Sequence, residues 1–396
     1  MTKTTAFTFT LTVALTLATS TVTPNTGNFT DSVSVAMQSA SSGGSASLQN
    51  TRAGVTYYVS KTGSDSNTCS EAQNVATPKL TIAAGITCLQ ANPLGNRLEI
   101  RGGTYPERLR SADLTFPTGS NWSNAPTIAA YSGETVLLQP PPGTLGEVLG
   151  LTDPNIQYLV FDGLILDAIN VDDVNPDPSF GPRNGNVVSI HGGAGNIKFV
   201  NCEIKNAGGM GIYGIVKGLL WVASSKIHHN GDVLGDHGIY AVGDFLIENG
   251  EFHNNSGYGL QLYPTASTGT IRGNFIHSNA SGITVVGTFD INNNVFANQS
   301  KGVEMGRESI DGRIYDNTFY DLTAAGLEIG YCYDGVEASS CATGTIAKNN
   351  TYESVRVPLD LQPRSSITQN DELCYNVAST TGCTTIASGP VTQRVR

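Results

Sequence analysis

The sequence contains few charged residues, and positive charge is the scarcer sign. Charged side chains make up 14% of the 396 residues, and 22 Lys and Arg stand against 33 Asp and Glu, for a formal net charge of −11. This balance disfavours a protein that is held to nucleic acid by a basic surface. The chain also lacks an apolar run of the ~20 residues that a membrane-spanning helix needs. We therefore expect neither a nucleic-acid partner nor a transmembrane segment.

Long uninterrupted helices are not expected either, because 45 Gly and 17 Pro are spread through the chain. No Cys-x-x-Cys pair occurs, so a structural zinc site is not expected. The seven cysteines instead predict three local disulfides and one buried thiol, Cys202. The predicted pairs are Cys69 with Cys88, Cys332 with Cys341, and Cys374 with Cys383.

The N-terminal 53 residues differ in composition from the rest of the chain. Residues 1–20 place Lys3 before an apolar stretch that Thr interrupts, which predicts a secretory signal peptide. Residues 21–53 are rich in Ser, Thr and Gly, and they predict a disordered linker because they cannot bury enough surface to offset chain entropy. With the predicted disulfides, this indicates a secreted or cell-surface protein. Residues 54–396 are expected to form a single domain.

Related short segments recur along the chain at the intervals of a solenoid. Most successive anchor residues lie 20 to 25 residues apart, as from Cys202 to Ser225. Asn recurs in two columns, one made of Asn274, Asn294, Asn317 and Asn350 and the other of Asn230, Asn255 and Asn279. We expect both columns to stack as ladders whose side-chain amides hydrogen-bond along the axis of the solenoid.

A second element follows most anchors after eight or nine residues, with Gly before apolar, variable and apolar residues, as in Gly282-Ile283-Thr284-Val285. The alternation has a period of two and predicts a short strand with one face inward. Two or three such strands and their turns make one coil of a parallel β-helix. Residues 80–89 predict a short amphipathic helix that covers the open N-terminal end of the coils.

These features resemble the right-handed parallel β-helix proteins of the pectate-lyase-like superfamily over about residues 55 to 370. The segments that carry the resemblance are Tyr57-Tyr58-Val59-Ser60, Arg101-Gly102-Gly103-Thr104-Tyr105, His228-His229-Asn230-Gly231 and His237-Gly238-Ile239-Tyr240. The resemblance implies an all-β fold with a short N-terminal capping helix. It does not imply one chemistry, because such repeats serve lyases, hydrolases, epimerases and adhesins.

The variable position of the repeated strand predicts one outward stripe, since equivalent residues of successive coils lie about 4.8 Å apart. The stripe runs through Ser189, Tyr213, Tyr240, Gln261, Thr284, Glu304, Glu328 and Asp360. Within it we assign substrate binding to Tyr213, Gln261, Glu304, Glu328 and Asp360. Carboxylates on neighbouring coils raise each other's pKa or need a cation. Glu304, Glu328 and Asp360 therefore predict a calcium site with Glu304 and Glu328 as ligands, an acid/base pair, or a surface charge ladder neutralised by Lys301 and Arg307.

A second group of candidate residues lies on adjacent coils around His237. Elimination from a uronate requires a base, an acid for the leaving oxygen and a group that neutralises the carboxylate. His237 is the candidate base, Tyr240 or Tyr263 the candidate acid, and Gln261 or a cation the carboxylate partner. Lys301 and Arg307 complete the predicted catalytic set. Three further histidines, His228, His253 and His277, share another column and are either a metal site or a repeat preference.

Three functions remain open from the sequence. The first is a lyase that cleaves an acidic polysaccharide by β-elimination, with calcium bridging the substrate to a protein of net charge −11. The second is a glycoside hydrolase that uses two of Glu304, Glu328 and Asp360. The third is a non-catalytic glycan-binding or adhesive solenoid. In each case a polysaccharide is the expected partner, and a monomer is the expected state.

Overall fold

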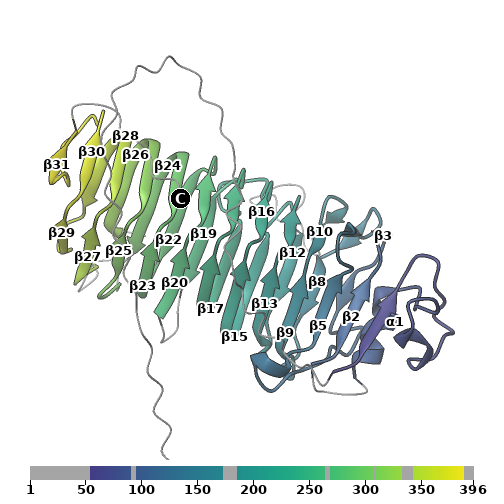
Figure 1. Cartoon of the computed structure of the whole chain (residues 1–396). Coiled ribbons are helices and arrows are strands. Elements are labelled where there is room, and N and C mark those ends of the chain that lie inside the picture. The colour runs from purple at the N-terminus through teal and green to yellow at the C-terminus, as the bar shows by residue number, and fades with distance from the viewer. Residues whose placement is uncertain are drawn as a thin grey trace, which may run out of the picture. The chain divides into compact units, whose positions relative to one another are not determined.

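The computed structural model of the chain describes residues 54–90, 95–172, 185–263, 268–306, 309–331 and 342–387. All of them lie in one compact unit, Asn50–Arg396. Parallel strands lie side by side as the rungs of a stack, with α1 (Ile82–Leu89) next to β1 (Thr56–Val59) at one end and β31 (Thr385–Ile386) at the other (Figure 1). The predicted signal peptide and linker, residues 1–53, lie outside the described residues.

Each coil contributes a strand to up to three sheet faces, which we name A, B and C. Face A consists of β4 (Leu109–Arg110), β8 (Glu147–Leu151), β12 (Asn186–Ile190), β19 (Tyr258–Tyr263), β22 (Ser281–Val285), the first parts of β15 (Ile212–Ala223) and β17 (Ile239–Glu248), and the last parts of β24 (Val295–Gly306), β26 (Thr318–Tyr331) and β28 (Thr351–Leu361).

Face B consists of β1, β2 (Arg97–Ile100), β5 (Thr127–Ala130), β9 (Gln157–Asp162), β13 (Gly195–Val200), β20 (Thr268–Arg272), β23 (Thr288–Asn292), β25 (Arg313–Tyr315), β27 (Thr345–Lys348), β29 (Ile367–Asn370) and the last parts of β15 and β17. Face C consists of β3 (Gly103–Tyr105), β6 (Val136–Leu138), β10 (Leu164–Asp167), β14 (Glu203–Lys205), β16 (Lys226–His228), β18 (Glu251–His253), β21 (Phe275–His277), β30 (Leu373–Tyr375), β31 and the first parts of β24, β26 and β28. Strands β7 (Thr144–Leu145) and β11 (Val171–Asp172) pair separately.

The turn from face B to face C shows why Asn recurs in the repeats. Its first residue takes the left-handed backbone conformation, with φ of 54° at Asn293, 57° at Asp316 and 54° at Asn349. Asn and Asp tolerate this conformation better than most residues. The next residue, as in Asn294 and Asn317, is buried and immediately precedes the following strand.

The predicted Asn ladders form. Asn294 Nδ2 donates to Asn317 Oδ1 at 3.0 Å, and Asn317 Nδ2 donates to Asn350 Oδ1 at 3.0 Å. Each Oδ1 also accepts the backbone N–H of the preceding ladder residue, as Asn317 Oδ1 does from Asn294 at 3.0 Å. The second ladder runs from Asn230 through Asn255 to Asn279. These bonds satisfy buried polar groups that would otherwise carry a desolvation cost.

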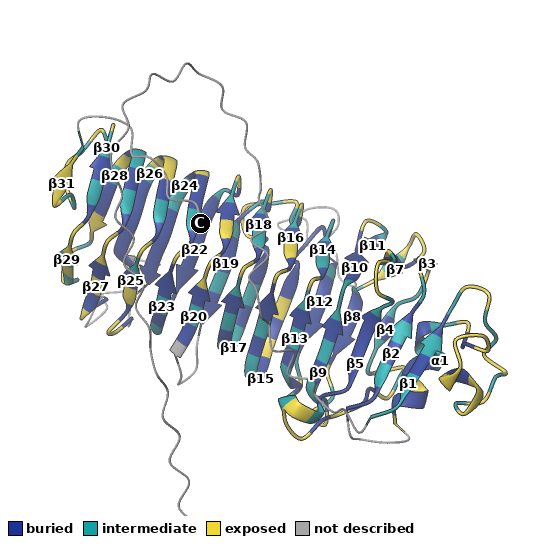
Figure 2. Ribbon diagram, in the orientation of Figure 1, coloured by how far each residue is buried: buried dark blue, intermediate teal, exposed yellow. Residues whose placement is uncertain are grey.

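Apolar side chains fill the interior between the three faces. On face A the inward residues Val188, Ile212, Ile239, Leu260, Ile283, Val303, Leu327 and Leu359 lie in register on successive coils. Aromatic rings stack in the same way from Phe296 to Phe319 to Tyr352, with centroids 5.1 and 5.0 Å apart. Buried residues therefore continue along the strands through the stack (Figure 2).

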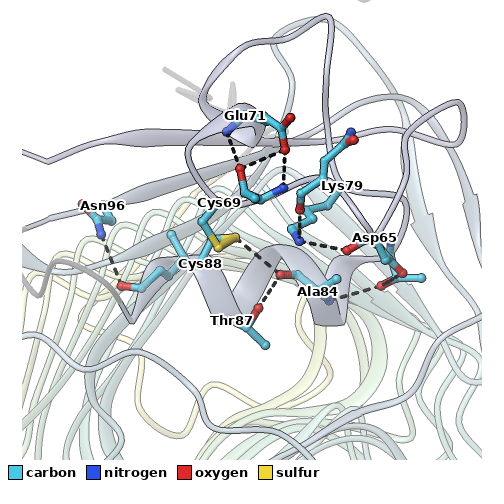
Figure 3. The surroundings of a disulfide bond; sticks show 12 residues. Asp65, Cys69, Glu71, Lys79, Ala84, Thr87, Cys88 and Asn96 are labelled. Carbon is cyan, nitrogen blue, oxygen red and sulfur yellow. Dashed lines mark hydrogen bonds between the residues drawn. A yellow bond between two sulfur atoms is a disulfide. The ribbon is translucent and has the colours of Figure 1, made fainter.

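The N-terminal cap confirms the predicted helix with a shifted start. The sequence predicts a helix over residues 80–89, but α1 begins at Ile82 because Thr81 is its N-cap and accepts from Ala84 N–H at 3.1 Å. Asp65 and Glu107 accept further N–H groups at this end. The Cys69–Cys88 disulfide ties the helix to the preceding loop (Figure 3).

The other cysteine predictions have mixed outcomes. The Cys374–Cys383 disulfide forms, and Cys202 is a buried free thiol, both as predicted. Cys332 and Cys341 lie outside the described residues. The two disulfides indicate an oxidising compartment. No helix among the described residues is long and apolar enough to cross a membrane.

Removing one ladder amide is expected to destabilise the whole stack. Asn317→Ala removes the acceptor of the Asn294 backbone N–H and of one of the two Asn294 Nδ2 hydrogen bonds, and it removes the side-chain donor to the Ile291 carbonyl. We expect the free energy of unfolding to fall by about 3 kcal/mol or more. Chemical denaturation measures this, with Thr368→Ala on the exposed side of β29 as a control. An equal effect of the two substitutions would contradict the ladder's role.

The ladder ends at a buried carboxylate, and this end is expected to be sensitive to pH. Glu372 accepts from Asn350 and from the Tyr352 hydroxyl at 2.6 Å, yet burial raises its pKa from 4.5 to about 7. Because the folded chain holds this proton more tightly, Glu372 lowers stability as the pH rises from about 4.5 to 7.

Glu372→Gln keeps an acceptor for Asn350 and removes this titration. We expect the variant to be more stable than the wild type above pH 7, by up to about 3 kcal/mol, and to lose this advantage near pH 4. Denaturation curves between pH 4 and 8 test this. Wild-type and variant curves that run parallel across this range would show that Glu372 does not titrate there.

Candidate functional site on face A

Face A confirms the predicted register of the outward stripe. Backbone pairing places Ser189, Tyr213, Tyr240, Gln261, Thr284, Glu304, Glu328 and Asp360 side by side on successive coils. We call this set the central column. Its members differ in exposure, because Ser189, Thr284, Glu304 and Glu328 are buried while Tyr213 and Asp360 are exposed.

Aromatic rings line the N-terminal half of the face. Tyr213 stacks on Tyr240 with centroids 5.7 Å apart, and His191 contacts Tyr213 edge-on at 5.1 Å. Tyr240 in turn lies 6.0 Å from Tyr263 and 5.8 Å from His237. Ile215, which pairs with Val242 in the next outward column, is 61% exposed. These aromatic and apolar side chains lie together from the end of β12 to β19, and we call them the aromatic row.

His237 is brought next to Gln261, Tyr240 and Tyr258, as the sequence predicts for the first two. Its Nδ1 accepts the backbone N–H of Tyr258 at 3.0 Å, and its side chain hydrogen-bonds Gln261. Burial lowers the pKa of His237 from 6.5 to about 4, although the Gln261 hydrogen bond opposes this shift. The imidazole is therefore neutral near pH 7, and its proton resides on Nε2 because Nδ1 is an acceptor.

The other half of the face holds a buried ionic network. Lys301 Nζ lies 3.4 Å from Glu304 Oε1 and also binds Glu328 Oε2. The Tyr258 hydroxyl donates to Glu304 Oε2 at 3.0 Å, and Ser281 donates to Glu304 Oε1 at 3.1 Å. The remaining Glu328 oxygen accepts from Gln362 Nε2 at 3.2 Å. These contacts explain why both carboxylates are buried despite their outward register, and we call this set the Glu304–Lys301–Glu328 cluster.

The pKa values of Glu304 and Lys301, both within this network, are raised for different reasons. Burial raises the pKa of Glu304, and the charge of Glu328 adds to the rise. Lys301, Tyr258 and Ser281 lower this pKa, but they do not cancel the rise. Burial lowers the pKa of Lys301, but its bonds to Glu328 and Glu304 outweigh this and raise it overall. Lys301 is therefore held as an ammonium between the two carboxylates.

The hypothesis of calcium between Glu304 and Glu328 does not fit these residues. Calcium binds six to eight oxygen ligands, whereas the Lys301 ammonium already lies between the two carboxylates. Among the described residues, no group of three or more His, Cys, Asp or Glu side chains is arranged to hold a metal ion.

Some residues of the site were predicted and others were missed. Tyr258, Ser281 and Gln362 bind the two carboxylates but were given no role on sequence grounds. In the sequence, the available indication of these contacts is that each of the three residues begins or directly follows a strand of face A. Arg307, a predicted catalytic residue, lies outside the described residues.

The histidine column lies on face C, away from this network. His228 stacks on His253 at 4.7 Å and His253 on His277 at 5.0 Å, with nearly parallel rings. Glu203 binds His228 Nε2 at 3.2 Å and Glu251 binds His277 Nε2 at 3.3 Å. These contacts hold the rings in place as part of the repeat, and these described side chains form no group arranged to hold a metal ion.

The comparisons with known proteins agree with this architecture. Residues 179–296 and 246–371 match the family described as right handed beta helix region. This part of the chain is a right-handed parallel β-helix, as the sequence predicts. No curated protein matches the chain significantly.

Several solved structures are similar in fold at low identity. A pectate lyase is 13% identical with a TM-score of 0.41, over 80% of this chain and 79% of the other. A lacto-N-biosidase from Eubacterium ramulus is 12% identical with a TM-score of 0.48, over 80% and 67%. A periplasmic alginate epimerase is 14% identical with a TM-score of 0.37, over 70% and 71%. At such identities the similarity concerns the fold alone.

The state of His237 can be tested directly. With a folded pKa of about 4, its ring is expected to stay neutral from pH 5.5 to 8, with the proton on Nε2. In the urea-unfolded chain it should titrate near 6.5, so this residue lowers stability as the pH falls from about 6.5 to 4. Long-range ¹H–¹⁵N NMR of the imidazoles measures both the titration midpoint of His237 and the ring nitrogen that carries its proton. A folded-state midpoint near 6.5, or a proton on Nδ1, would contradict the geometry.

Proposed function

We propose that the protein is an exported carbohydrate-active β-helix that binds a polysaccharide along face A and hydrolyses its glycosidic bonds. The observation that carries the proposal is the pair Glu304 and Glu328, which lie on adjacent coils and share one ammonium. Pairs of carboxyl groups are the usual catalytic groups of glycoside hydrolases. The aromatic row beside the pair supplies the flat surface on which sugar rings stack.

The shared ammonium limits the separation of the two carboxyl groups. Two oxygens that contact one nitrogen are separated by no more than two contact lengths, about 6 Å. Retaining hydrolases have carboxyl groups about 5 to 5.5 Å apart, whereas inverting hydrolases need about 6.5 to 9.5 Å to admit a water. The pair Glu304 and Glu328 therefore supports retention of the anomeric configuration.

The environments of the two carboxylates suggest their roles. Glu304, whose pKa burial raises, is suited to protonate the leaving oxygen. Glu328, held by Lys301 and Gln362, is suited to attack the anomeric carbon as a carboxylate. Both groups are buried in this state, so the glycan has to displace a covering side chain. Tyr258, which reaches Glu304 from the aromatic row, is the side chain that we expect to move.

The β-elimination hypothesis has less support from the same geometry. His237, the predicted base, uses its Nδ1 to accept an N–H and carries its proton on Nε2. Lys301, the other basic group of the site, is bound to two carboxylates. Neither group is in a state to remove a proton from the carbon of a uronate. Tyr240 and Tyr263 then act on the substrate as part of the aromatic row.

Two product assays on a panel of neutral and acidic polysaccharides distinguish these activities. We expect new reducing ends without a rise in absorbance near 235 nm. Glu304→Gln and Glu328→Gln are each expected to lower kcat by about 10²-fold or more. Azide should restore turnover to Glu328→Ala if Glu328 is the nucleophile.

Glu353→Gln, on the face C part of β28, is the matched control and should keep full activity. Circular dichroism must show that all variants are folded, because Glu304 and Glu328 are buried. A rise at 235 nm would establish elimination instead. Binding of a glycan without either product would make the protein a glycan-binding solenoid.

A further inference from the structure

The arrangement of charges on face A also indicates whether the glycan that it binds is charged or neutral. We infer that the glycan bound on face A is uncharged rather than a polyuronate. The inference rests on the proposed glycan-binding function and on three features of the described residues: how the cations are paired, where the anions lie, and which side chains are exposed.

Two described cations of face A, Lys301 and Arg110, are already paired with carboxylates, whereas the exposed Lys217 and Arg356 lie at its edges. Lys301 binds both Glu304 and Glu328. Arg110, which extends the central column through Gly150, lies 3.0 Å from Asp113 and 3.7 Å from Glu147. A uronate carboxylate on face A would have to compete with two protein carboxylates for either cation.

The ring nitrogens of the face are also poor partners for a polyanion. Burial lowers the pKa of both His191 and His237, so both imidazoles are neutral near pH 7. At the far end of the central column Asp360 is exposed and adds negative charge. A chain with one negative charge per sugar would be repelled along this column, in a protein whose net charge is −11.

The exposed groups instead suit neutral sugar rings. Tyr213 and Ile215 are 36% and 61% exposed on β15, and Tyr240 lies on the next coil. Aromatic and aliphatic side chains contact the apolar faces of pyranose rings, and the Gln261 amide is a neutral hydrogen-bonding partner for hydroxyl groups. Face A therefore recognises hydroxyl-bearing sugars through stacking and neutral hydrogen bonds.

Polysaccharide pairs that share a backbone and differ in carboxylate content test the inference. Suitable pairs are methyl-esterified and de-esterified homogalacturonan, mannan and polymannuronate, and xylan and glucuronoxylan. Affinity electrophoresis at low salt should show binding of at least one uncharged member, at least tenfold tighter than its charged partner. The gap should narrow at high salt, because salt screens the repulsion.

Two Ile→Lys substitutions separate the effect of face A from that of net charge. Ile215→Lys adds a cation to face A, and Ile346→Lys adds the same charge to an exposed position of β27 on face B. We expect Ile215→Lys to raise affinity for the charged member several-fold and Ile346→Lys to leave it unchanged. Equal effects of the two substitutions, tighter binding of the charged member by the wild type, or binding to none of the six chains would overturn the inference.

In these experiments the binding inference and the proposed hydrolysis can be refuted independently of each other. Uncharged chains that bind without new reducing ends would support the inference and refute hydrolysis. An acidic chain that binds best and is hydrolysed with loss of activity in Glu328→Gln would support hydrolysis and refute the inference.

Discussion

The stacking of the coils in register depends on the buried amide ladders. One side chain at the same point of each coil hydrogen-bonds the backbone and the side chain of its neighbour, so a shift by one residue would leave several buried polar groups unpaired. The left-handed residue before each ladder position turns the chain onto the next face. Because the columns of these coils follow the same register, the ladders also place the central column of face A from Tyr213 to Asp360.

The same stacking explains how a site forms on a repetitive scaffold. Adjacent coils bring side chains from residues 20 or more apart in sequence to within one strand spacing, as with Glu304 and Glu328. Two like charges at that distance are unfavourable unless a cation joins them, and Lys301 supplies it from the start of the same strand part as Glu304. Tyr258 then connects this ionic cluster with the aromatic row.

The chemistry of face A depends on which of its side chains are neutral and which are charged. His237 donates through Nε2 because a backbone amide uses its Nδ1, so it positions Gln261 instead of accepting a proton. The carboxylates hold the nearby cations, and the aromatic row remains for sugar rings. Hydrolysis by a carboxylate pair and selection of an uncharged chain both agree with this distribution, whereas elimination from a uronate would need a basic group in a different state.

The sequence by itself determined the repeat, the strand columns, the two Asn ladders, the capping helix and two of the disulfides, because each depends on local pattern or on equivalent positions of successive coils. It also placed Glu304 beside Glu328 and His237 near Gln261. Only the tertiary structure decided that Glu304 and Glu328 are buried, that Lys301 joins them and that His237 is a donor. These properties depend on long side chains that cross between columns, such as Tyr258 and Gln362, and a column alignment carries no information on where such side chains point.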